Sequence, residues 1–210
     1  MDAMMKCRLF FVYAVFFVFG ASIHAQEEEV AKLETAINDA MKIIYSAKYE
    51  DETFTQKSAA VRAVLEQNYD LMVIIRRTMG RNWKLLSTAE QVRVKELISQ
   101  LVVKAFIDGL QGLERPTIEY GKLISINDKR FEVSSSVVFL ENKAFNITYR
   151  FGRLKTGWQI YDILAEDVSV VASYRQQIDD HFRKGTGVEL IEKLEKLLER
   201  ENLNEKTVKL

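Results

Sequence analysis

The stretch that decides the fold runs from Trp158 to Arg175 and reads WQIYDILAEDVSVVASYR. Its first half, Trp158–Leu164, is rich in aromatic and β-branched residues and follows Gly157, which predicts a strand. Its second half carries apolar residues at helical spacing, and Asp167 stands where an N-cap is expected. A strand therefore runs almost directly into a helix, and this corner sets how the helix lies across a sheet.

The region before the corner, from Thr117 to Leu164, has a hydrophobic period of two and predicts a four-stranded sheet. The turn signals Asn127-Asp128, Glu141–Lys143 and Lys155–Gly157 are short, which favours an antiparallel meander. Its alternating sets are Ile118, Tyr120, Ile124 and Ile126; Phe131, Val133, Ser135, Val137 and Phe139; Phe145, Ile147, Tyr149 and Phe151; and Trp158 and Ile160, with Asp162 next in the alternation.

Helical periodicity dominates the rest of the chain. An N-terminal helical part spans about residues 27–115, and C-terminal helices span about 167–201. Within the first part, Ser87 and Glu90 form a capping box and Gly80 ends a helix. The expected helices are Val30–Tyr49, Thr53–Glu66, Tyr69–Met79, Thr88–Leu110 and Val188–Glu201. Together these segments predict an α+β domain over residues 26–201, with a polar tail at 202–210.

Residues 1–25 have the pattern of a cleavable signal peptide. Two basic residues precede an apolar run, Leu9–Phe19, that is short for a bilayer span, and Ile23-His24-Ala25 is an acceptable cleavage site. An uncleaved membrane anchor is the alternative. The single cysteine, Cys7, lies in this segment, so the exported chain is expected to fold on its core without disulfides.

The composition argues against several classes of function. The 30 basic and 30 acidic residues cancel, which disfavours nucleic-acid binding. No metal site or cofactor is expected, and the histidine left after cleavage, His181, is interpreted as an exposed helical residue. Asp162 is the best acid candidate, since a carboxylate against an apolar pocket can act as a general base. The preferred interpretation pairs it with Arg175, because an unpaired buried carboxylate is costly.

Two motifs in the chain resemble the MlaC family of periplasmic phospholipid carriers, also called toluene-tolerance auxiliary proteins. The first motif is W-x-x-Y-D-x-x-x-x-x-V-S from Trp158 to Ser169, followed by Y-R at Tyr174-Arg175. The second reads Tyr69-Asp70, Met79-Gly80-Arg81-Asn82-Trp83, Leu86-Ser87 and Glu90-Gln91, with Tyr69 and Met79 standing where the family has phenylalanine and leucine. The resemblance covers about Val30 to Leu198.

The resemblance implies an NTF2-like cone, in which a curved four-stranded sheet and several helices enclose a lipid-binding cavity. It also implies a periplasmic, monomeric carrier that moves phospholipid between an outer-membrane lipoprotein complex and an inner-membrane ABC transporter with an MCE-domain ring. Such a carrier is not an enzyme. Three alternatives remain: a carrier of hopanoid or another polycyclic lipid, an exported cone-fold enzyme using Asp162, and an interaction module with a packed interior.

A lipid pocket is expected between the sheet and the helical part. One alternating set of strand residues must face the helices, and the segment before Gly80 is placed opposite it. Asp162 and Arg175 are assigned a structural or headgroup role. The expected lipid-binding residues are Leu71, Ile75, Met79, Trp83, Val133, Val137, Phe139, Ile147, Tyr149, Ile160, Val171 and Tyr174.

The signal peptide gives the first testable prediction. Cleavage after Ala25 yields a mature chain that begins at Gln26, and intact mass spectrometry of periplasmic material measures this directly. Recovery of the full-length chain in the inner membrane would show that the segment is an anchor.

Overall fold

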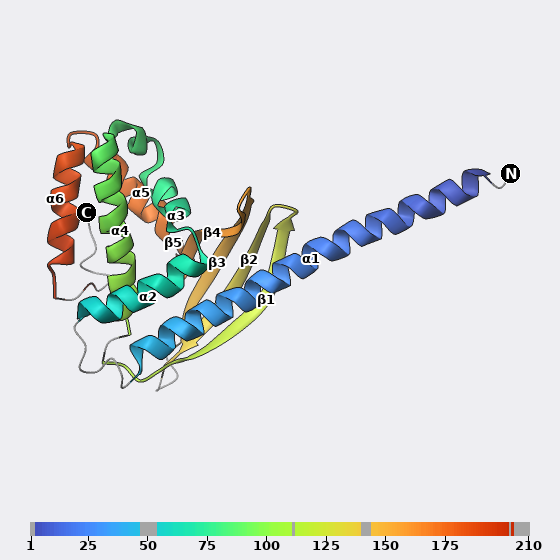
Figure 1. The fold of residues 1–210 in the computed structure, drawn as a ribbon, viewed down its shortest axis with the longest axis horizontal. Helices are drawn as coiled ribbons and strands as arrows, with labels where there is room; N and C mark the ends of the chain where they lie inside the picture. The colour runs from blue at the N-terminus through green and yellow to red at the C-terminus, as the bar shows by residue number, and fades with distance from the viewer. Residues whose placement is uncertain (1–2, 47–53, 111, 140–143, 202, 204–210) are drawn as a thin grey trace.

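The computed structural model describes residues 3–46, 54–110, 112–139, 144–201 and 203, with side chains from residue 24 onward. Its helices and strands follow one another in an α+β arrangement (Figure 1). They are α1 (Ala3–Ile44), α2 (Phe54–Asn68), α3 (Leu71–Met79), the 3-10 helix η2 (Gly80–Leu85), α4 (Thr88–Asp108), β1 (Thr117–Asn127), β2 (Arg130–Val138), β3 (Ala144–Leu154), β4 (Gly157–Ala165), β5 (Val168–Ser169), α5 (Val170–His181) and α6 (Gly187–Leu198).

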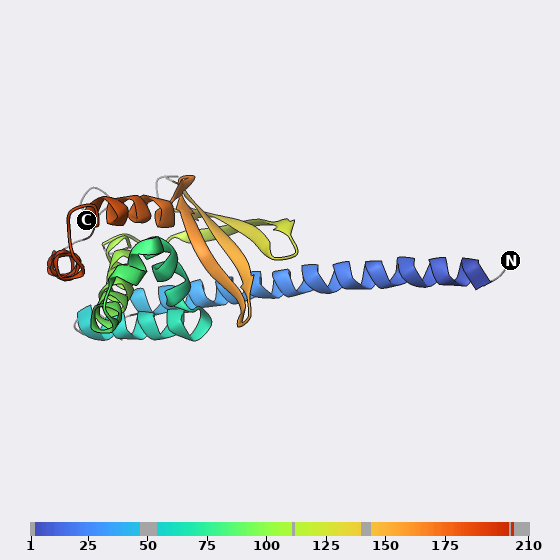
Figure 2. The same ribbon diagram turned by 90° about the horizontal axis from the view of Figure 1, so that it is seen from above.

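The sheet is an antiparallel meander in the order β1-β2-β3-β4-β5 within the described residues. The four strands expected from the sequence are present, and the predicted total of four is wrong because β5 adds a short fifth strand of two residues. The predicted turn at 141–143 lies outside the described residues. Because each strand pairs with its neighbour in sequence, the sheet has two continuous faces. One face packs against α1 and the other against α5 (Figure 2).

The corner between β4 and α5 is a tight hairpin followed by the helix. Glu166 and Asp167 both have positive φ, 46° and 63°, the combination that two-residue hairpin loops favour. Asp167 therefore lies in the turn, and its expected role as N-cap is wrong. Ser169 is the N-cap instead, since its Oγ accepts a hydrogen bond of 3.0 Å from the Ala172 amide.

A β-bulge in β4 reverses the direction of Asp162. Arg150 pairs with Asp162, whereas Phe151 pairs with Ile160, so Tyr161 is an extra residue on β4. One extra residue moves the following side chain to the other face of the sheet. The expectation that Asp162 continues the alternation of Ile160 is therefore wrong, and its carboxylate lies on the face that α5 covers.

The Asp162 carboxylate is held at the N-terminus of α5 by several donors. Ser169 Oγ donates to it at 2.8 Å, and the backbone amides of Ile163 and Val171 lie 2.9 and 3.3 Å from its Oδ1. Arg150 Nη1 lies 3.4 Å from Oδ2. A helix N-terminus favours a negative charge. The predicted ion pair between Asp162 and Arg175 is wrong, because these groups occupy the carboxylate.

Arg175 instead closes the C-terminal end of α3. Its guanidinium donates two hydrogen bonds to the backbone carbonyl of Arg77, in the last turn of that helix. Gly80 follows with φ 54°, and a Cβ there would meet Arg175 Nε at 3.4 Å. The positive φ therefore favours glycine at this position, and the Arg175 side chain packs beside it at van der Waals distance. The two motifs, far apart in sequence, meet at this point.

Caps and polar contacts fix the remaining helices. The capping box at Ser87 and Glu90 is confirmed, and a second one opens α6 at Thr186 and Glu189. The Asp70 side chain caps α3. Polar contacts also tie α3 to β4 and η2 to α5: the Asp70 amide donates to Gln159 at 2.8 Å, and Asn82 donates to Asp179 at 2.6 Å.

Apolar side chains form three clusters within the described residues. The first lies between α1 and the sheet, and the second lies among α3, α4, α5 and α6. The third joins α1, α2 and α4 around Ala40, Val61, Val103 and Ile107. Figure 2 shows α1 along one side of the sheet and α5 on the other.

Helix α1 is continuous from Ala3 to Ile44 and therefore passes through the predicted cleavage position. It extends far beyond the rest of the fold towards its N-terminus (Figure 1). Within the described part of the chain, none of the helices combines the length and apolar character needed to cross a membrane.

The position of Asp162 predicts which residues are energetically coupled. Asp162→Asn should destabilise the fold by about 3 kcal/mol, because it removes a charge from donors that stay buried. A double-mutant cycle with Ser169→Ala should give a coupling of about 1 kcal/mol, whereas the cycle with Arg175→Gln should give less than about 0.5 kcal/mol. Denaturant unfolding measures both, and strong coupling to Arg175 would contradict the assignment.

Candidate functional site

The inner face of the sheet, which α1 covers, is the candidate site. The register places its strand residues side by side: Val133 is opposite Tyr149, and Phe131 is opposite Phe151. The rings of Phe131 and Phe151 are stacked with centroids 4.5 Å apart. Helix α1 contributes the facing apolar side chains, namely Leu33, Ala36, Ile37 and Met41, with Val30, Ile44 and Tyr45 at the margin.

The structure gathers the predicted strand residues on this face. Val133, Tyr149 and Ile160 are buried in the first cluster, and Phe139 and Ile147 pack against it. Val137 is buried on the same face, opposite Phe145 and Ile118.

The helical residues expected opposite the sheet lie elsewhere. Ile75 and Met79 are buried in the second cluster with α4, α5 and α6, and Leu71 and Trp83 pack against that cluster. Their predicted position facing the strands is therefore wrong. Only Ile74 of α3 packs against the first cluster, because neighbouring positions of a helix point to different sides.

The two residues predicted from α5 are on the other face of the sheet. Val171 is buried where its amide meets the Asp162 carboxylate. Tyr174 is partly buried, and burial raises the pKa of its phenol. They do not join the strand residues of the first cluster.

Sequence reasoning missed α1 as the wall of the site. The signal was present, since the stripe from Val30 to Tyr45 has helical spacing. Periodicity shows that a helix has an apolar face but does not say which partner the face meets. Which of the two helices, α1 or α3, packs against the inner face is therefore decided by tertiary contacts.

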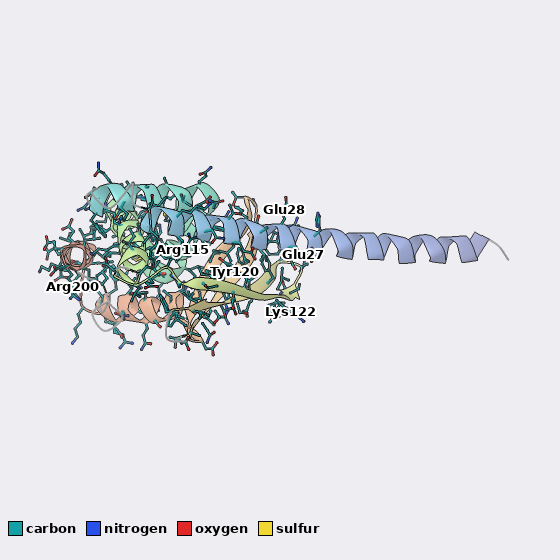
Figure 3. The ribbon with its side chains drawn as sticks, turned by 90° about the horizontal axis from the view of Figure 1, so that it is seen from below. Glu27, Glu28, Arg115, Tyr120, Lys122 and Arg200 are labelled. Atoms are coloured by element: carbon teal, nitrogen blue, oxygen red, sulfur yellow. The ribbon has the colours of Figure 1, made fainter. Side chains whose placement is uncertain are left out.

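Polar atoms without partners lie within this apolar interface. Tyr69, Tyr120 and Ser135 each carry a buried hydroxyl that has no hydrogen-bond partner. From α1, an amide oxygen of Gln26 also lacks a hydrogen bond, and Glu29 Oε2 has no hydrogen bond but forms an ion pair with Lys32. These five groups are called the buried polar cluster. Figure 3 shows Tyr120 on β1 beside α1.

The tyrosines of the cluster are electrostatically linked. Burial raises the pKa of Tyr69, and the Glu29 carboxylate and the neighbouring phenols of Tyr120 and Tyr149 raise it further. The pKa of Tyr120 is raised by burial and then by Tyr149 and Glu34. All these phenols are therefore neutral at physiological pH.

Tyr149 and Lys32 complete the surroundings of the cluster. Burial also raises the pKa of Tyr149, and the interaction with the neighbouring Ser135 hydroxyl partly offsets the rise. Lys32 Nζ lies 3.5 Å from Glu29 Oε2 and 4.9 Å from the centre of the Tyr69 ring. The interface thus contains neutral hydroxyl donors beside one ion pair.

Residues considered for catalysis have structural partners. His181 Nε2 lies 2.9 Å from the Thr186 carbonyl, and its Nδ1 lies 3.2 Å from Lys193 Nζ. The Asp162 carboxylate faces away from the first cluster. In the part of the chain that the structure describes, no group of three or more His, Cys, Asp or Glu side chains could hold a metal ion.

Comparison with known proteins finds a matching family model and similar solved structures. The family model described as MlaC protein matches residues 34–196. A solved structure of a phospholipid-binding protein from Ralstonia solanacearum, in complex with a phospholipid, is similar in fold, with a TM-score of 0.69 and 20% sequence identity. The alignment covers 80% of this chain and 95% of that one. No curated protein sequence matches significantly.

The raised tyrosine pKa values predict alkaline unfolding. A phenol whose pKa is raised by folding stabilises the native state below about pH 10, and that stability is lost as the pH rises, because the unfolded chain ionises first. Each such phenol adds about 1.4 kcal/mol per pH unit to the slope of stability. Tyr69→Phe should reduce the slope between pH 10 and 11.5 by this amount in urea unfolding. An unchanged slope would contradict the burial of Tyr69.

Proposed function

The chain belongs to the MlaC family, and from this premise we propose that it is a periplasmic phospholipid carrier. The observation that carries the proposal is the family match over most of the chain, joined to a sheet whose inner face carries large apolar side chains that pack against α1. The fold shared with a phospholipid-bound protein supports the same function. The NTF2-like cone is part of this proposal.

The acyl chains lie between α1 and the inner face of the sheet in this proposal. The sheet supplies Val133, Val137, Tyr149 and Ile160, and α1 supplies its apolar stripe. The second cluster, with Ile75 and Met79, remains a packed helical core. The lipid headgroup stays outside, where water can solvate its charge.

The energetics of chain burial suit a carrier. Burying an acyl methylene is worth about 0.8 kcal/mol relative to water, so about 30 methylenes give on the order of 25 kcal/mol. Release into water is negligible on this scale. Exchange with a bilayer is nearly neutral, since one apolar surrounding replaces another. The direction of transport therefore has to come from the partners.

The partners in this proposal are an outer-membrane lipoprotein complex and an inner-membrane ABC transporter with an MCE-domain ring. The transporter hydrolyses ATP, and the carrier performs no catalysis. The hydrogen bonds of Asp162 support the absence of catalysis in the carrier. Its carboxylate is held by backbone amides and by Ser169. Export depends on the segment 1–25 acting as a cleavable signal peptide.

A pair of adjacent substitutions tests the position of the lipid. Val137→Trp places bulk on the inner face, and Val138→Trp places the same bulk on the outer face as a matched control. Val137→Trp should lose most co-purified phospholipid while its melting temperature stays close to that of delipidated wild type. Native mass spectrometry and lipid extraction measure the loading.

A third variant separates the two apolar cores. Ile75→Trp overfills a packed helical core and should cost about 1–3 kcal/mol of stability. Loading of the folded fraction should be unchanged. If Ile75→Trp removes lipid and Val137→Trp does not, the chains lie among the helices and the proposed position is wrong.

A further inference from the structure

The buried polar cluster brings hydroxyls from three separate elements onto the surface that faces α1. Tyr69 precedes α3, Tyr120 lies on β1 and Ser135 lies on β2 opposite it. The Tyr69 and Ser135 residues are almost completely buried, at 7% and 3% exposure. Such side chains normally find a partner when buried.

The unpartnered groups weaken the closed contact between α1 and the sheet. Each buried donor or acceptor without a hydrogen bond costs about 1–3 kcal/mol relative to water. The apolar stripe of α1 favours closure, while the unpartnered amide oxygen of Gln26 on the same helix opposes it. A ligand that enters here and supplies hydrogen bonds removes the penalty.

The charges around the cluster restrict the chemistry of that ligand. Glu29 and Glu34 lie near the phenols of Tyr69 and Tyr120, so a phosphate or carboxylate would meet negative charge in a poorly solvated place. Lys32 is already beside Glu29. A neutral acceptor, by contrast, can take the three hydroxyl hydrogens without a charge penalty.

We propose that the hydroxyls of Tyr69, Tyr120 and Ser135 bind the ester carbonyls of a diacylglycerol lipid held between α1 and the sheet. The inference deepens the proposed carrier function and rests on it. Ester carbonyls are neutral acceptors located where the two acyl chains meet. The cluster therefore sets how deeply the lipid sits and selects ester-linked over ether-linked chains.

A lipid pair that differs only in the carbonyls tests the proposal. Delipidated full-length mature protein is loaded from vesicles of dioleoyl phosphatidylcholine or of its dioleyl diether analogue. The wild type should load the diester about tenfold more strongly, as expected for one to two hydrogen bonds. The variant Tyr69→Phe/Tyr120→Phe should load both lipids equally. Tyr161→Phe, on the outer face, is the matched control and should keep the preference.

The outcomes separate the two levels of the proposal. Equal loading of diester and diether by the wild type overturns the ester site but leaves the carrier function standing, with the cluster then a structural feature. Loss of the diester preference in the control Tyr161→Phe would also overturn the ester site. Loading of neither lipid by the wild type overturns the carrier function itself. The wild-type comparison needs no variant, so it holds even if the double variant does not fold.

Discussion

The carboxylate of Asp162 at the start of α5 is the constraint on which the arrangement depends. The bulge at Tyr161 turns it away from the inner face, and the amide of Val171 and the hydroxyl of Ser169 hold it there. This contact sets α5 on the outer face. Arg175, further along the same helix, then closes the C-terminal end of α3. With α5 and α3 placed in this way, α1 packs along the inner face.

This division gives the two faces of the sheet different properties. The outer side is joined to the helical core by specific polar contacts, such as those of Asp162 with Ser169 and with the Val171 amide of α5. The inner side meets α1 through apolar side chains and through polar groups that lack partners. The β4–α5 junction is held by many hydrogen bonds, whereas the contact between α1 and the inner face contains unpartnered polar groups. This difference suits a protein that opens between α1 and the sheet while the rest of its fold is preserved.

Much of the fold could be predicted from the sequence, because periodicity and capping are local. The strands, the capping box at Ser87 and the glycine at Gly80 are examples. The position of Asp162 could not be predicted, since one bulged residue reverses the alternation and leaves no clear local signal. Of the residues predicted for the site, those on the strands lie together on one face of the sheet. Ile75 and Met79 were placed wrongly, because an amphipathic stripe does not identify its partner.

The central claim is that acyl chains lie between α1 and the inner face of the sheet. Crosslinking with a phospholipid that carries a photoreactive group in one acyl chain, followed by peptide mass spectrometry, tests it most directly. The account predicts labelling of α1 around Leu33 and Ile37 and of the strands around Val133 and Tyr149. Labelling concentrated in the helical core around Met79 would contradict it.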